Sequence, residues 1–105
     1  MAKIIGVASC PVGIAHTYIA AESLEKTGKK LGYQVKIETD GAVGVANKLT
    51  AEDIEEAIAV IIASDINVPM DRFLGKPVLI VSTAEAIQNA EKCFKQIEEG
   101  KAEIY

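Results

Sequence analysis

Three short apolar runs constrain most strongly what this chain can fold into. They read KIIGVAS at residues 3–9, AVIIAS at residues 59–64 and PVLIVS at residues 77–82. Apolar runs of this length, without strict alternation, are typical of strands buried on both faces of a parallel sheet. A fourth strand is predicted at residues 34–39, where QVKIET alternates polar and apolar side chains.

Between these strands the apolar residues have helical spacing. One helix is predicted over residues 14–31, with lysines in its last turns and Gly32 as its stop. Two more are predicted over residues 51–57 and 84–99. Both are preceded by residue pairs that resemble capping boxes, Thr50 with Asp53 and Ser82 with Glu85.

Strands that alternate with helices predict an α/β protein with three layers, α/β/α, around a mostly parallel four-stranded sheet. The expected order of strands across the sheet is 34–39, 3–9, 59–64 and 77–82. The 105 residues suffice for one hydrophobic core, so residues 1–105 are expected to form a single domain. Ligands of such sheets bind outside the carboxyl ends of the strands. The segments expected to converge there are the loop after residue 9, the turn at 39–41 and the loop at 64–65.

Charge and cysteine spacing exclude several classes of function. The formal net charge of −4 argues against nucleic acid or anionic membrane surfaces as main partners. No apolar run is long enough to span a bilayer, and the first residues do not resemble a signal peptide. Cys10 and Cys93 are far apart and show no metal-ligand or CxxC spacing. We therefore expect a reduced, cytoplasmic setting and no metal or other cofactor.

The segment SCPVGIAHT, residues 9–17, holds Cys10 and the single histidine of the chain. Such a segment could be a redox site, a metal site, a nucleophile or a turn with a buried thiol. Its predicted place, between a strand and a helix, favours an anion site, because the first helical N–H groups and the helix dipole point toward it. A thiol placed there is expected to have a lowered pKa, and the same donors would hold a phosphoryl group on sulfur. The predicted phosphate-binding residues are Pro11, Val12, Gly13, Ile14, Ala15, His16 and Thr17.

The loop lacks residues that several types of phosphate or thiol chemistry require, which reduces the number of reactions it could support. The loop has no second cysteine for a thioredoxin-like reaction and no Lys-Ser/Thr pair for an ATP-binding phosphate loop. Cysteine phosphatases carry arginine six residues after the nucleophile, where this chain has His16. The loop is therefore expected to hold phosphate on Cys10 rather than hydrolyse it rapidly. A small cysteine phosphatase or arsenate-reductase-like enzyme remains an alternative, as does a non-catalytic regulatory module.

Other polar residues have ordinary structural interpretations beside functional ones. Cys93 has helical spacing with apolar neighbours and is predicted to lie in the core. Arg72, the single arginine, is predicted to pair with Asp71 or with a helix carboxylate rather than to clamp a phosphate. The acidic residues 52–56 are predicted to form a solvated helix face. His16 either supports the anion electrostatically or simply packs at the helix start. The apolar residues Pro11, Val12 and Ile14 are expected to form a partner-docking rim.

Four motifs carry a resemblance to a known family. They are CPVGIAHT at residues 10–17, VKIET at 35–39, GVANKLTAEDI at 44–54 and DRFLGKP at 71–77. Together they resemble the fructose-family IIB component of the bacterial sugar phosphotransferase system over nearly the whole chain. The resemblance implies a phosphotransferase in which Cys10 accepts a phosphoryl group from a phosphohistidine of a IIA partner. It further implies transfer to fructose or a related sugar held by the membrane-embedded IIC partner, at the cytoplasmic face of the membrane.

Overall fold

The computed structural model describes residues 2–9, 14–41, 44–64 and 70–105. Four strands form the body of the sheet, namely β1 (Lys3–Ser9), β2 (Gln34–Gly41), β4 (Ala57–Ser64) and β5 (Pro77–Val81). Helix α1 (Ile14–Lys30) connects β1 to β2, and the short α2 (Ala51–Glu56) precedes β4. Helices α3 (Thr83–Gln88) and α4 (Ala90–Glu98) follow β5. The predicted α/β class is confirmed.

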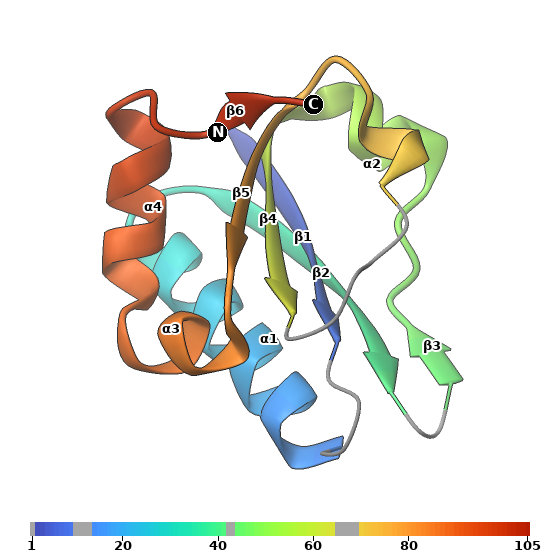
Figure 1. Cartoon of the computed structure of the whole chain (residues 1–105), viewed down its shortest axis with the longest axis vertical. Coiled ribbons are helices and arrows are strands. Elements are labelled where there is room, and N and C mark those ends of the chain that lie inside the picture. The colour runs from blue at the N-terminus through green and yellow to red at the C-terminus, as the bar shows by residue number, and fades with distance from the viewer. Residues whose placement is uncertain (1, 10–13, 42–43, 65–69) are drawn as a thin grey trace.

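The central sheet has the predicted parallel core and two additional edge strands (Figure 1). Its order is β3-β2-β1-β4-β5-β6, and the four inner strands run parallel in the expected order. Strands β3 (Gly44–Ala46) and β6 (Glu103–Ile104) pair antiparallel with β2 and β5. The prediction of four strands was wrong because β3 and β6, three and two residues long, are too short to leave a periodic pattern.

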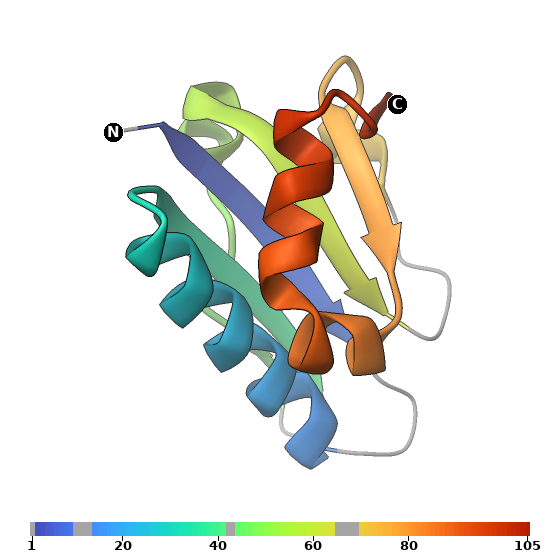
Figure 2. The same cartoon turned by 90° about the vertical axis from the view of Figure 1, so that its left-hand side faces the viewer.

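The helices divide the core between the two faces of the sheet. Helices α1, α3 and α4 cover one face, which lies toward the viewer in Figure 2. Helix α2 and a 3₁₀ turn (Asp71–Phe73) cover the other. Alternation along β1 serves both layers, since Ile4 and Ala8 pack under α1 whereas Ile5 and Val7 pack on the opposite face. The predicted three-layer arrangement is therefore confirmed, and the layer formed by α2 and the 3₁₀ turn is the thinner of the two helical layers.

The carboxyl-terminal helix differs from its prediction. The expected single helix over 84–99 is broken at Asn89, where the backbone turns out of the helical region at φ −130° and ψ 41°. Asparagine is a weak helix former, because its side chain competes for backbone hydrogen bonds. The break re-aims the chain while Ala86, Cys93 and Phe94 all stay buried. The predicted cap at Ser82 is present, and its hydroxyl accepts the N–H of Glu85 at 3.1 Å.

The acidic segment 52–56 is only partly the solvated face that was predicted. The capping box between Thr50 and Asp53 is present in both directions. Asp53 also accepts hydrogen bonds from Lys3 at 2.7 Å and from Lys36 at 2.6 Å, and its side chain is 13% exposed. The hydrogen bond from Lys3, which has the largest effect, and the one from Lys36 hold the pKa of the Asp53 carboxyl well below its usual range. Asp53 thus links α2 to β1 and β2. The prediction missed this link because helical spacing alone cannot show which carboxylate meets a lysine of a strand.

Candidate functional site

The carboxyl ends of three strands lie side by side at one edge of the sheet. Ser9, the last residue of β1, is in register with Asp40 of β2 and with Ser64 of β4. Helix α1 starts at the same edge, at the bottom of Figure 1, and runs back along the sheet. The predicted convergence of these strand ends is confirmed, although Asp65 lies outside the described residues.

The central residues of the predicted phosphate loop are not part of the described structure. Cys10, Pro11, Val12 and Gly13 lie outside the described residues, and of Ile14 and Ala15 only the backbone is described. The ends of the segment are nevertheless fixed, because β1 ends at Ser9 and the 17-residue helix α1 begins at Ile14. Cys10 therefore follows β1 directly and precedes a helix amino terminus by a few residues. This is the setting that favours anions, through unpaired N–H groups and the helix dipole.

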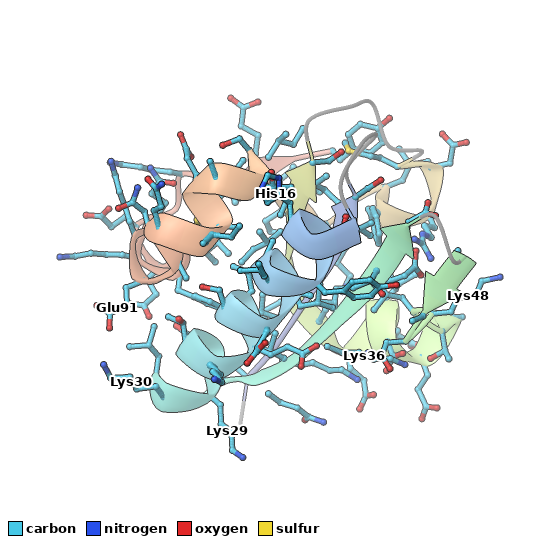
Figure 3. The ribbon with its side chains drawn as sticks, turned by 90° about the horizontal axis from the view of Figure 1, so that it is seen from below. His16, Lys29, Lys30, Lys36, Lys48 and Glu91 are labelled. Carbon is cyan, nitrogen blue, oxygen red and sulfur yellow. The ribbon has the colours of Figure 1, made fainter. Side chains whose placement is uncertain are left out.

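His16 and Thr17, both in the first turn of α1, differ in exposure. His16 is exposed, and Figure 3 shows it at the end of α1 opposite Lys29 and Lys30. With Ile19 of α1 and Thr83, Ala84, Ile87 and Gln88 of α3, it lines a hollow of about 320 Å³. Thr17 is wholly buried. The imidazole is therefore accessible to a partner, whereas the Thr17 side chain lies under the helix.

Arg72 makes a structural ion pair, as predicted, but with a partner that was not predicted. Its guanidinium donates to both carboxylate oxygens of Glu38, at 2.9 and 2.6 Å, and lies 5.0 Å from the centre of the Phe73 ring. The Glu38 side chain is 6% exposed and also accepts the N–H of Leu49. Burial opposes the ionisation of Glu38, but the hydrogen bonds from Arg72 and Leu49 outweigh it, so the Glu38 pKa is lowered overall. This pair fixes β2 just before its carboxyl end.

Thr39 also lies at this edge of the sheet, and the sequence analysis did not predict that its side chain is buried there. It is 3% exposed, and within the described residues its hydroxyl has no hydrogen-bond partner. The prediction placed Thr39 at the end of the strand at 34–39 and at the start of the turn at 39–41, whereas β2 continues through it to Gly41. The sequence signal was available in the alternation of β2, since Thr39 is two residues beyond the buried Ile37 and shares its face.

Cys93 lies in the core, as predicted. It is 2% exposed, among the residues that α1, α4 and the sheet bury together. Burial raises the pKa of its thiol, so it is held in the protonated, weakly nucleophilic form. Cys93 is therefore a suitable internal control for any reactivity assigned to Cys10.

Two negative observations apply to the described parts of the chain. None of their helices is both long and apolar enough to cross a membrane. They also contain no group of three or more His, Cys, Asp or Glu side chains placed to hold a metal ion.

The fold, with a parallel sheet and a helix that begins beside the carboxyl end of its first strand, defines a class of three-layer α/β domains, and comparison with known proteins identifies the family. Residues 5–96 match the family model described as "PTS system, Lactose/Cellobiose specific IIB subunit". The PTS system fructose-like EIIB component 2 of Escherichia coli K12 is 46% identical over 99 residues, which cover 93% of each chain. The PTS system fructose-specific EIIABC component of Bacillus subtilis is 44% identical over 98% of this chain, which spans 16% of that relative.

Solved structures agree with the sequence relatives. A domain from the fructose-specific IIABC component of Borrelia burgdorferi superposes with a TM-score of 0.94 at 45% identity, covering 99% of this chain and 98% of that one. A domain of fruA from Bacillus subtilis gives a TM-score of 0.89 at 42% identity, covering 99% and 100%. The chain belongs to the IIB family of the sugar phosphotransferase system, and within it to the fructose-type EIIB components. The resemblance seen in the sequence motifs is thereby confirmed.

Proposed function

We propose that this chain carries a phosphoryl group on Cys10 between a phosphorylated EIIA partner and a sugar bound by a membrane EIIC partner. The observation that carries the proposal is the position of Cys10, between the end of β1 at Ser9 and the amino end of α1 at Ile14. That position lowers the pKa of a thiol and provides N–H donors for an anion on sulfur. Membership of the fructose-type EIIB components supports the same function.

The proposed transfer has two steps that conserve electrons and atoms. First, the Cys10 thiolate attacks the phosphorus of a phosphohistidine, the S–P bond forms and the P–N bond breaks. The imidazole leaves with the electron pair of that bond and takes up a proton. In the second step a sugar hydroxyl oxygen attacks the phosphorus, the S–P bond breaks, and the thiolate is regenerated as the hydroxyl proton passes to solvent.

The residues after Cys10 supply the proposed cradle. The backbone of Pro11 to Thr17 surrounds the phosphoryl group, and its N–H groups near the helix start compensate the negative charge. His16 is exposed at this edge, and its imidazole can donate a hydrogen bond toward the phosphoryl group. Without an arginine at position 16, the charge that builds up during hydrolysis is less well neutralised, which favours a carrier over a phosphatase.

The names of the relatives support the proposed partners. The Bacillus subtilis relative is a fructose-specific EIIABC component and that of Haemophilus influenzae a fructose-specific EIIB'BC component, so B and C components occur in single proteins. The proposed sugar is fructose or a close relative, and the proposed location is the cytoplasmic face of the membrane that holds EIIC.

Transfer from a phosphorylated fructose-type EIIA protein tests the proposal. We expect intact-mass spectrometry of the wild-type chain to show a gain of about 80 Da, the mass of one phosphoryl group, after mixing with phosphorylated EIIA. Unphosphorylated EIIA serves as the control and should give no gain. Steady turnover of an aryl phosphate by the chain alone, with no mass gain from EIIA, would instead indicate the phosphatase alternative.

A further inference from the structure

The hydroxyl of Thr39 is buried without a hydrogen-bond partner in the described part of the protein. Its oxygen is enclosed, and the residue as a whole is 3% exposed. Burying a hydroxyl without a partner costs free energy, of the order of 1–3 kcal/mol in mutational data. Valine has nearly the same shape and would avoid that cost. A buried threonine hydroxyl without a partner is therefore a candidate to bind an acceptor atom of a ligand.

The topology places Thr39 beside the proposed phosphate site. Thr39 is opposite Ala8 in the β1–β2 register, and Ala8 is two residues before Cys10. The pleat puts Thr39 on the same face as Ile37, which packs under α1. Thr39 is also one residue nearer to the carboxyl edge than Glu38, at the end where α1 begins with Thr17 buried beneath it. The unsatisfied hydroxyl thus lies on the α1 side of the sheet, at the end where the phosphoryl group would arrive.

Neighbouring polar groups on β2 are already engaged, which sets Thr39 apart. The Glu38 carboxylate binds Arg72 and the N–H of Leu49 on the opposite face. Asp40 is exposed to solvent. Within the described residues, Thr39 is therefore the group on this strand end that gains most from a new buried acceptor.

We propose that Thr39 is a further ligand of the phosphoryl group on Cys10, and that its hydroxyl donates a hydrogen bond to a phosphoryl oxygen only in the phosphorylated protein. This inference rests on the carrier function proposed above and assigns a specific residue of β2 to it. A hydroxyl that is unsatisfied in the resting protein and satisfied in the phosphorylated one shifts the transfer equilibrium toward the phosphorylated state.

Two variants of Thr39 separate this role from a structural one. Thr39→Val removes the hydroxyl and keeps the shape, whereas Thr39→Ser keeps the hydroxyl and loses a methyl group. Thr27→Val, a half-buried threonine toward the other end of α1, is the matched control for the same chemical change. The measurements are the melting temperature of each unmodified protein and the equilibrium constant for transfer from phosphorylated EIIA, read by intact mass.

We expect Thr39→Val to melt at or above the wild-type temperature, because an unsatisfied hydroxyl is removed. Its transfer equilibrium should shift toward phosphorylated EIIA by about tenfold or more, the usual effect of losing a hydrogen bond to a charged group. Thr39→Ser and Thr27→Val should keep the wild-type equilibrium within about twofold.

Three results would overturn the inference. An unchanged equilibrium in Thr39→Val would show that the hydroxyl does not contact the phosphoryl group. A lower melting temperature of unmodified Thr39→Val would show that the hydroxyl already has a partner in the resting protein. A wild-type chain that accepts no phosphate would overturn the carrier function and this inference with it, whereas the first two results leave the carrier function intact.

Discussion

Replacing Cys10 with serine should abolish phosphorylation by EIIA, whereas replacing Cys93 with serine should leave it intact. The proposed nucleophile is a thiolate, and a serine hydroxyl at the same position is not ionised near neutral pH. Cys93 lies in the core, where burial raises its thiol pKa and closes off access. The two substitutions are chemically identical, so each controls for the other.

Intact mass after mixing with phosphorylated EIIA gives the result directly. The gain of about 80 Da should be absent in Cys10→Ser and complete in Cys93→Ser. Because a hydroxyl at position 93 is itself buried, a thermal melt should accompany the assay, and Cys93→Ala replaces the serine variant if it is poorly folded. Phosphate retained in Cys10→Ser would move the acceptor to another residue.

Replacing Arg72 with leucine should lower the free energy of unfolding by about 3 kcal/mol, because it leaves the buried Glu38 carboxylate without a positively charged partner. The Arg72 guanidinium donates two hydrogen bonds to the Glu38 carboxylate and balances its charge. The Glu38 side chain is 6% exposed. Within the described residues, the other donor to that carboxylate is the N–H of Leu49, which carries no charge. The loss also releases the 3₁₀ turn from β2, since the guanidinium links Asp71–Phe73 to that strand.

Urea unfolding of Arg72→Leu, with Glu38→Gln and the double variant, completes a thermodynamic cycle. The double variant should be more stable than Arg72→Leu alone, since it no longer buries an unpaired carboxylate at position 38. The native pKa of Glu38 is lowered overall, so its contribution is complete above the unfolded pKa of about 4.3 and is lost as the pH falls through the native value. The difference between wild type and Arg72→Leu should therefore narrow below about pH 4. A difference independent of pH would contradict the ion-pair explanation.

The parts of the fold that follow from local pattern were predictable. β1 could be placed over residues 3–9 because every one of its residues is buried, which leaves an unbroken run of apolar residues and glycine at 4–8. The start of α1 at Ile14 and the stop at Gly32, which has a φ of 91°, also follow from local chemistry. The site edge followed in turn, because parallel strands bring their carboxyl ends to one edge.

The features that sequence reasoning missed depend on partners distant in the chain. Arg72 and Glu38 are 34 residues apart, and nothing local shows that their strand and turn meet across one sheet face. The Asn89 break leaves the apolar spacing of a single helix almost intact, so periodicity could not reveal it. The unsatisfied hydroxyl of Thr39 is a property of the folded surroundings, not of the residue type.

A chase of the phosphorylated chain shows whether Cys10 carries phosphate to a sugar. The chain is labelled with radioactive phosphate through EIIA, separated from it, and mixed with membranes that contain a fructose-type EIIC, with and without fructose. If Cys10 is the carrier, the label passes to sugar phosphate only when membranes and sugar are both present, and otherwise stays on the protein. Release of the label as inorganic phosphate at the same rate under all conditions would show a hydrolase and contradict the carrier function.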